Sequence, residues 1–261
     1  MLGLHTWFEN RYFIKKAGYV ADFCKICRKN RRFQLLQLNY QFLVFYIPVF
    51  GTKINGYFKT CLNCMTRYEA EPSIYPVLCR RLEPLEDMLR SLPKPTKESD
   101  ERLAIENLII NSPASISHEL RMKLIREPFF ILSPEVDSQL KLPGLESTGF
   151  FMIIATQIIG YFILLETGII DLIDNPVLFF ALLFGSGFLL YLFYAITKRN
   201  RFIMKFLIPN LATALRPLKP TEEEFQIVID QLNDKKLKIG RIMANDHLTR
   251  LKQAIYQDQF D

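Results

Sequence analysis

Histidine is scarce in this chain of 261 residues, and the motifs with which many enzymes bind phosphate are missing. The three histidines, His5, His118 and His247, are scattered, so none is expected to act as a metal ligand or catalytic base. The sequence contains neither a Walker loop nor a G-x-G-x-x-G turn, and no Ser/His/Asp or Cys/His arrangement can be recognised. We therefore predict a protein that is not an enzyme.

Lysine and arginine are absent from residues 147–197, where only three acidic residues occur. Two uncharged stretches lie in this segment, at 149–165 and 176–197. A membrane-spanning helix needs about 20 apolar residues. We expect a transmembrane hairpin over 147–197, with an acidic loop at 166–175. The alternative is a helical hairpin buried in a soluble core.

The charges around these stretches predict an orientation. The second stretch is followed by Lys198, Arg199, Arg201 and Lys205, whereas the loop contains Glu166, Asp171 and Asp174 and no cation. Cationic flanks stay on the cytoplasmic side of a membrane. We therefore expect an integral membrane protein with both termini in the cytoplasm and the acidic loop on the opposite side.

Cysteine is infrequent, but four of the five cysteines form two matched pairs with C-x2-C spacing. Each such turn directs two sulfurs to one point, and two turns supply the four thiolates of a closed structural Zn²⁺ site. Iron is the runner-up, since rubredoxin-type electron carriers use the same pairs. The fifth cysteine, Cys79, would be an odd thiol in an oxidising compartment, which favours a reducing one. The predicted ligands are Cys24, Cys27, Cys61 and Cys64.

Residues 1–70 have the pattern of a small β-rich domain. Short apolar stretches at Tyr12–Ile14 and Tyr19–Phe23 lead to the first cysteine pair. Arg32–Val49 is the longest predicted strand, with partial alternation of apolar and polar residues. Pro48 should end its pairing, and Ile54–Thr60 should return as a strand to the second cysteine pair.

The order of these motifs resembles the zinc-ribbon family found at the N-terminus of small, mostly uncharacterised membrane proteins. The resemblance covers about residues 10–70 and rests on Cys24–Cys27, Phe45–Pro48 and Tyr57–Cys64. It implies a structural zinc site at the four paired cysteines. Ribbons of this kind often have glycine after the second cysteine of each pair, where this chain has Arg28 and Met65.

Residues 71–146 are predicted to form a helical connector on the cytoplasmic side. One helix should begin near Ser99 or Asp100 and end near Ile110. A second should begin after Ser115 and end before Pro128 and Pro134, because proline interrupts helices. The apolar Phe129–Leu132 is expected either at a membrane surface or in an ordinary core.

Residues 198–261 are predicted to form a cytoplasmic helical tail. Thr221 and Glu224 have the spacing of a capping box, and apolar residues follow at helical intervals. Two further helices are expected at Ile239–Ala244 and Asp246–Tyr256. The complete fold class is α+β: a zinc ribbon over 1–70, the connector over 71–146, the transmembrane hairpin over 147–197 and this tail.

The N-terminal segment is basic, with 11 Lys and Arg residues against three Asp and Glu residues in 1–70. We rank a protein as its first partner, anionic lipid as the second and nucleic acid as the third. The function predicted from the sequence is a membrane-anchored zinc ribbon that recruits or scaffolds a partner at the cytoplasmic face. Five cations gather at the first cysteine pair: Lys25, Arg28, Lys29, Arg31 and Arg32.

Overall fold

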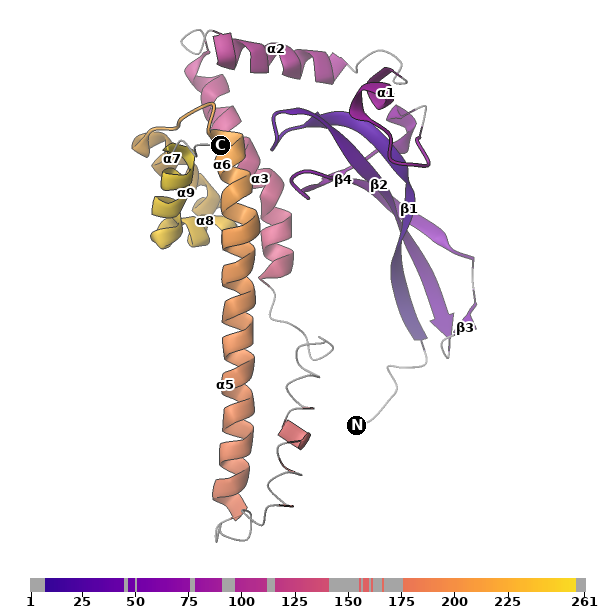
Figure 1. Cartoon of the computed structure of the whole chain (residues 1–261), viewed down its shortest axis with the longest axis vertical. Coiled ribbons are helices and arrows are strands. Elements are labelled where there is room, and N and C mark those ends of the chain that lie inside the picture. Colours follow the sequence, from indigo (N-terminus) through magenta and orange to yellow (C-terminus); the bar gives the residue numbers. More distant parts are fainter. Residues whose placement is uncertain are drawn as a thin grey trace.

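The computed structural model confirms an α+β fold, with an antiparallel sheet followed by helices (Figure 1). It describes residues 8–44, 47–49, 51–75, 78–90, 97–111, 116–140, 155, 157–159, 161, 166 and 176–256. The sheet is five-stranded, with the order β1-β2-β4-β5 and with β3 paired to β2. Its strands are β1 (Phe8–Cys24), β2 (Lys29–Val44), β3 (Ile47–Pro48), β4 (Lys53–Cys61) and β5 (Arg67–Glu69).

The first two strands form a long antiparallel hairpin. Their register runs from Cys24 opposite Lys29 to Phe8 opposite Val44. The two short apolar stretches predicted before the first cysteine pair are joined in β1, because a bulge between Lys16 and Gly18 accommodates one extra residue. β1 is therefore longer than β2. The expectation that the longest strand would cover 32–49 was wrong, since β2 begins at residue 29 and ends at residue 44.

The helices form two groups along the chain. The first comprises the 3₁₀ turn η1 (Pro72–Ile74), α1 (Leu85–Arg90), α2 (Lys97–Asn111) and α3 (His118–Gln139). The second begins with a continuous helical rod made of α5 (Pro176–Phe202), the π-helical turn η4 (Ile203–Leu207) and α6 (Ile208–Leu215). It ends with α7 (Glu222–Asp234), α8 (Lys238–Ile242), the π-helical turn η5 (Met243–His247) and α9 (Leu248–Tyr256).

Helix α3 differs from its prediction at both ends. Its N-cap is Ser117, whose hydroxyl accepts a hydrogen bond from the Leu120 amide, whereas Ser115 lies outside the described residues. The helix continues through Pro128 and Pro134, each of which costs about 3 kcal/mol inside a helix. Burial offsets this cost, because five apolar side chains of α3 lie in the core: Leu124, Ile125, Phe129, Leu132 and Val136. The membrane-surface alternative for Phe129 and Leu132 was therefore wrong.

The tail follows its sequence pattern more closely. The capping box at the start of α7 is confirmed: the Thr221 amide donates to Glu224 Oε2 at 2.8 Å, and the Glu224 amide donates to Thr221 Oγ1 at 3.3 Å. The apolar residues that follow the capping box at helical intervals are all buried: Phe225, Val228, Ile229 and Leu232. The two helices expected after it are present as α8 and α9, joined by η5.

One hydrophobic core connects the sheet with the helices. It includes Phe33 of the sheet, Phe129 of α3, Leu211 of α6 and Phe225 of α7, all fully buried. We call α3 and α6–α9 the helical module. The cysteine end of the sheet faces this module, whereas α5 extends away from it along the long axis of the molecule (Figure 1).

The segment predicted to be a transmembrane hairpin is only partly described. Among the residues that the structure describes, no helix combines the length and apolarity needed to cross a bilayer. Most of the first predicted span and of the acidic loop lie outside the described residues. Gln157 of the first predicted span lies close to Gly187 of the second, since a Cβ built on Gly187 would lie 3.5 Å from the Gln157 side chain. The two-span arrangement stays a prediction.

Candidate metal centre

The sheet topology places the four predicted ligands at one edge. Cys24 ends β1 and Cys27 lies in the turn that leads to β2. Cys61 ends β4 and pairs with Phe33 of β2, and Cys64 lies in the turn that follows. Because β2 lies between β1 and β4, both turns emerge at the same end of the sheet. We call this the metal end, and we call the two turns the first and second knuckles.

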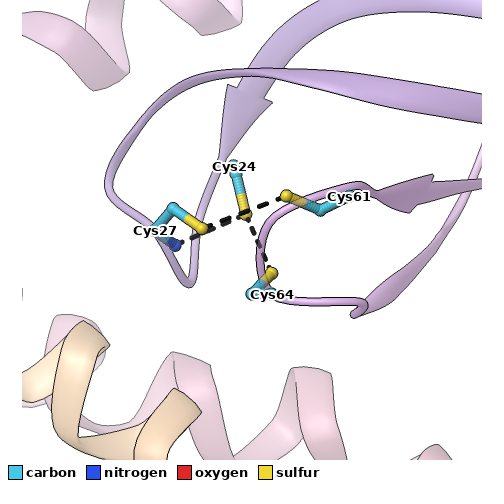
Figure 2. A group of neighbouring side chains, drawn as sticks. All are labelled: Cys24, Cys27, Cys61 and Cys64. Atoms are coloured by element: carbon cyan, nitrogen blue, oxygen red, sulfur yellow. Dashed lines mark hydrogen bonds between the residues drawn. The ribbon is translucent and has the colours of Figure 1, made fainter.

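The four sulfurs have the spacing of a tetrahedral site (Figure 2). A metal with bonds of about 2.3 Å to four sulfurs would hold them about 3.8 Å apart. The Cys24 and Cys64 sulfurs are 3.5 Å apart, those of Cys27 and Cys61 are 3.9 Å apart, and all four lie within 4.8 Å of one another. All four residues are buried. The donor set and its dimensions therefore fit a single ion such as Zn²⁺, and they fit iron equally well.

Polar groups around the site are arranged to support thiolates. The Tyr68 hydroxyl lies 3.3 Å from Cys24 Sγ, and the Cys27 amide donates to the same sulfur at 3.4 Å. The Asn63 amide group donates to Cys27 Sγ at 3.4 Å. Such outer contacts orient the ligands and stabilise their negative charge. Tyr68 also packs edge-on against Phe33, which holds its ring in place.

Hydrogen bonds among the four sulfurs move the pKa values of the thiols in opposite directions. Hydrogen bonds from Cys24 and then Cys61 lower the pKa of Cys27, and the bond from Cys24 lowers the pKa of Cys61 to about 7. The pKa of Cys64 is raised, because its hydrogen bond with Cys24 favours its protonated form. Four negative sulfurs this close need a compensating positive charge, so binding of a metal would release protons.

The residues that replace glycine in the knuckles adopt the conformation that glycine would favour. Arg28 has φ 54° and Met65 has φ 57°, both in the left-handed region. Each closes its knuckle by a hydrogen bond: the Arg28 amide donates to the Cys24 carbonyl at 2.7 Å, and the Met65 amide to that of Cys61 at 2.9 Å. This conformation costs roughly 1–2 kcal/mol for a residue with a Cβ. The two knuckles thus have equivalent backbones.

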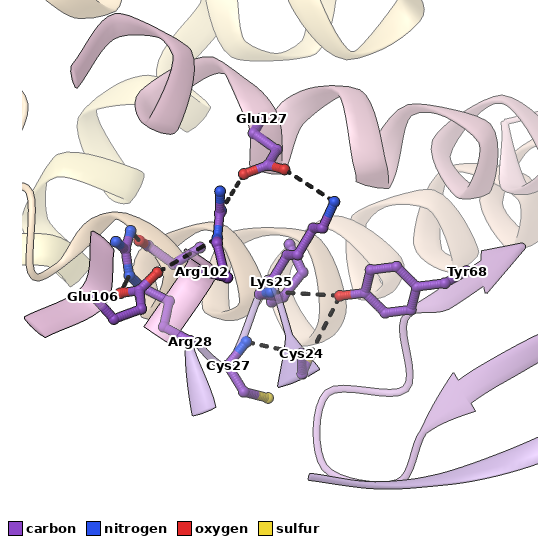
Figure 3. Close-up of polar contacts among 10 residues, drawn as sticks. Cys24, Lys25, Cys27, Arg28, Tyr68, Arg102, Glu106 and Glu127 are labelled. Carbon is purple, nitrogen blue, oxygen red and sulfur yellow. Dashed lines mark hydrogen bonds and ion pairs between the residues drawn. The ribbon is translucent and has the colours of Figure 1, made fainter. Parts of the chain in front are cut away.

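A buried ion-pair network joins the first knuckle to α2 and α3 (Figure 3). Arg28 Nε donates to Glu106 Oε2 at 2.7 Å, and the two side chains are only 6% and 8% exposed. Arg102 forms ion pairs with Glu106 and with Glu127 of α3, and Lys25 reaches Glu127 at 3.4 Å. The network contains three cations and two carboxylates.

Helix α6 binds both knuckles directly. Arg28 Nη1 donates to the Ala214 carbonyl at 3.0 Å, and the Asn210 side chain donates to the Cys64 carbonyl at 3.0 Å. The metal end is therefore attached to the helix that continues through η4 into α5. A shift of either knuckle would break a contact with α6.

These contacts change the interpretation of the basic cluster at the first knuckle. The cluster was expected to offer an exposed surface, but Arg28 is buried and Lys25 is paired with Glu127. Lys29 and Arg32 are exposed. The acidic partners Glu106 and Glu127 were not identified from the sequence. The sequence did contain one signal for this network: Arg102 and Glu106 are four residues apart, a spacing that favours an ion pair on one face of a helix.

The two histidines that the structure describes are not part of the centre. His118 is the first residue of α3 and His247 is the last residue of η5, whereas His5 lies outside the described residues. Comparison with models of protein families, with curated proteins and with solved structures found no match for this chain. The resemblance to zinc ribbons therefore rests on the motifs and on the geometry of the four sulfurs.

Proposed function

We propose that the four cysteines hold one structural Zn²⁺ and that the protein is a non-enzymatic scaffold attached to a membrane. The observation that carries the metal proposal is the set of four buried sulfurs at tetrahedral spacing. Four protein ligands leave no coordination position for a substrate or a water molecule. Such an ion stabilises a fold and is not expected to catalyse a reaction.

The role of the metal would be to hold the sheet on the helical rod. Both knuckles contact α6, and Arg28 links the first knuckle to the carboxylates of α2 and α3. Binding of zinc contributes folding free energy when the site forms only in the folded state. Loss of the ion would therefore release the knuckles and weaken the contact between the sheet and the module.

The membrane proposal rests on the apolar side chains of α5. Over residues 188–196 large apolar side chains are exposed on several sides of the helix, with Phe188 62% exposed, Leu189 66% and Phe193 71%. The same helix ends in Lys198, Arg199 and Arg201. Apolar groups exposed on several sides of a helix, followed by cations, suit a lipid environment bordered by phosphate headgroups. Both termini would then lie on the cytoplasmic side.

Metal analysis of the purified protein tests the first part. About one Zn²⁺ per chain is expected, and Cys61→Ser should abolish it while Cys79→Ser leaves it unchanged. Strong visible absorption with iron in place of zinc would instead support the rubredoxin-like electron carrier. Absence of stoichiometric metal, or its loss in the Cys79 variant, would contradict the proposed ligand set.

Labelling of single cysteines tests the second part. In a Cys79→Ser background, Leu172→Cys should react with an impermeant thiol reagent outside intact cells, whereas Asn200→Cys should react only after lysis. Reaction of both from outside would refute the proposed topology. Extraction of the protein from membranes by alkaline carbonate alone would refute a spanning anchor.

We also propose that a protein partner binds the exposed part of the metal end. The exposed cations Lys29 and Arg32 lie there, and the half-buried Tyr57 of β4 lies further along the sheet, opposite Gln37 of β2. Aromatic and Arg side chains usually dominate protein interfaces, whereas binding to lipid or nucleic acid depends on charge and falls with salt. Recovery of a partner that survives moderate salt is expected, and Tyr57→Ala, checked for metal retention, should weaken it. Recovery of mainly nucleic acid, lost on Arg32→Ala, would contradict the protein partner.

A further inference from the structure

The sheet is much longer than a metal centre requires. From Cys24 to Phe8, β1 extends roughly 50 Å at the usual rise per residue. The knuckles and their contacts with the helical module use only one end of it. We call the opposite end, made of residues 8–16, 36–44, 47–49 and 53–56, the far end of the sheet.

Exposed apolar side chains gather at the far end. Ile47 is 66% exposed, Ile54 54%, Val49 51%, Tyr12 57% and Ile14 51%. Ile47 lies in β3, Val49 follows that strand directly, and Ile54 lies near the start of β4, at the tip of the sheet. Exposed apolar groups concentrated in one region mark sites that bind lipid or protein.

The charges of the far end are almost all positive. Exposed cations are supplied by Arg11, Lys15 and Lys16 of β1 and by Lys53 of β4, whereas Glu9 is the one acidic residue in these ranges of the sequence. Apolar side chains flanked by cations fit a bilayer surface with acidic phospholipids, where each nearby cation contributes about 1 kcal/mol. An acidic protein would pair with these cations, but its binding would not require exposed apolar side chains at the ends of several strands.

The direction of the far end distinguishes it from the metal end. The end of the sheet that carries β3 and the helix α5 both lie away from the helical module, toward the same end of the long axis (Figure 1). The tip of the sheet is level with the part of α5 nearer the module, and α5 continues beyond it. A bilayer around α5 would therefore meet the tip of the sheet in the same leaflet. The core and the contacts of α6 with the knuckles fix this direction.

We propose that the far end of the sheet is a second membrane contact. The side chains of Ile47, Val49 and Ile54 enter the boundary between headgroups and acyl chains, and Arg11 and Lys53 bind acidic headgroups. This inference rests on the proposed membrane attachment of α5. With contacts at α5 and at the sheet, the metal end would be held at a fixed height and angle above the bilayer.

The test uses the full chain, loaded with zinc and reconstituted in vesicles of equal parts phosphatidylcholine and phosphatidylglycerol. Because the chain has a single tryptophan, Trp7→Phe provides a background for one reporter at a time. The reporters are Ile47→Trp at the far end and Lys29→Trp at the metal end, and each variant must retain its zinc. Lipids brominated near the top of the acyl chains quench tryptophan that is buried about 5–10 Å into the interface.

Quenching of the Ile47→Trp emission by about two-fold, with little effect on Lys29→Trp, is expected. Replacing Arg11 and Lys53 by Gln should reduce this quenching. Flotation of the protein with vesicles without quenching at position 47 would overturn the second contact and leave the α5 anchor intact. Failure to float would overturn the anchor and this inference together. Quenching equal at positions 47 and 29 would also contradict the proposed orientation.

Discussion

Neutralising Glu106 should separate the first knuckle from α2. Glu106→Gln keeps the shape of the side chain but leaves Arg28, which is 6% exposed, without its carboxylate partner. Removing one member of a buried ion pair costs about 3–5 kcal/mol, because the other charge stays buried and uncompensated. Arg28 keeps its bond to the Ala214 carbonyl, and Arg102 keeps Glu127. We therefore expect the lower limit, about 3 kcal/mol.

The same substitution at an exposed pair provides the matched control. Glu222 forms an ion pair with Lys252, but its side chain is 71% exposed. Exposed pairs contribute about 0–1 kcal/mol, because water and salt screen them. Glu222→Gln should therefore leave stability nearly unchanged, although the charge change is identical.

Pulse proteolysis of the zinc-loaded protein in increasing urea measures the free energy of unfolding of both variants in detergent. A loss of 3 kcal/mol is about a 100-fold change in the unfolding equilibrium. Glu106→Gln should also release zinc faster to a chromogenic chelator, since Arg28 directly follows the ligand Cys27. A loss below about 1 kcal/mol, equal to that of Glu222→Gln, would refute the view that the network secures the knuckle.

Three further predictions concern separate parts of the fold. Met65→Gly should stabilise the protein by about 1 kcal/mol in urea unfolding, because glycine adopts the positive φ of Met65 without strain and the side chain that is removed is 59% exposed. No gain in stability relative to Met65→Ala would contradict this. Gly240→Ala should destabilise it by about 1–3 kcal/mol, since its Cβ would lie 2.6 Å from Asn233 Oδ1 and 2.9 Å from Leu232 Cβ; an unchanged melting temperature would show that α8 adjusts. Burial is the largest single influence on Glu224 and opposes its ionisation, but the hydrogen bonds from Arg121 and the Thr221 amide, together with the positive charge of Arg121, outweigh it and lower the pKa. The stabilisation is therefore present above the unfolded pKa of about 4.3 and lost as the pH falls through the folded pKa. The stability difference between wild type and Glu224→Gln should therefore shrink at acidic pH, and a constant difference would contradict the ion pair.

The sequence predicted the parts of the fold that depend on local spacing. The cysteine pairs indicated which four sulfurs meet, because a ribbon needs only two turns at one end of a sheet. The capping box at Thr221 and the apolar intervals of α7 were equally local. The left-handed backbone at Arg28 and Met65 follows from the knuckle geometry, even though the residue types disfavour it.

The features that were missed depend on contacts between distant segments. Pro128 and Pro134 do not end α3, because burial of its apolar face offsets the cost of both prolines. Arg28 belonged to a cluster expected to be exposed, but packing of the knuckle against α6 buries it and Glu106 compensates its charge. Sequence spacing cannot show that residues 28, 106 and 214 meet.

The bridge between Tyr19 and Cys79 has a consequence for self-association. β1 is an edge strand of the sheet, and an uncovered edge can add a strand from another molecule. The Tyr19 amide donates to the Cys79 carbonyl at 2.8 Å, and the Cys79 amide donates to the Tyr19 carbonyl at 3.0 Å. Gly18 allows this approach, since a Cβ there would lie 3.1 Å from the Cys79 oxygen. The segment after the ribbon thus occupies the edge beside the metal end, and the bulge and the cations of β1 discourage strand addition further along.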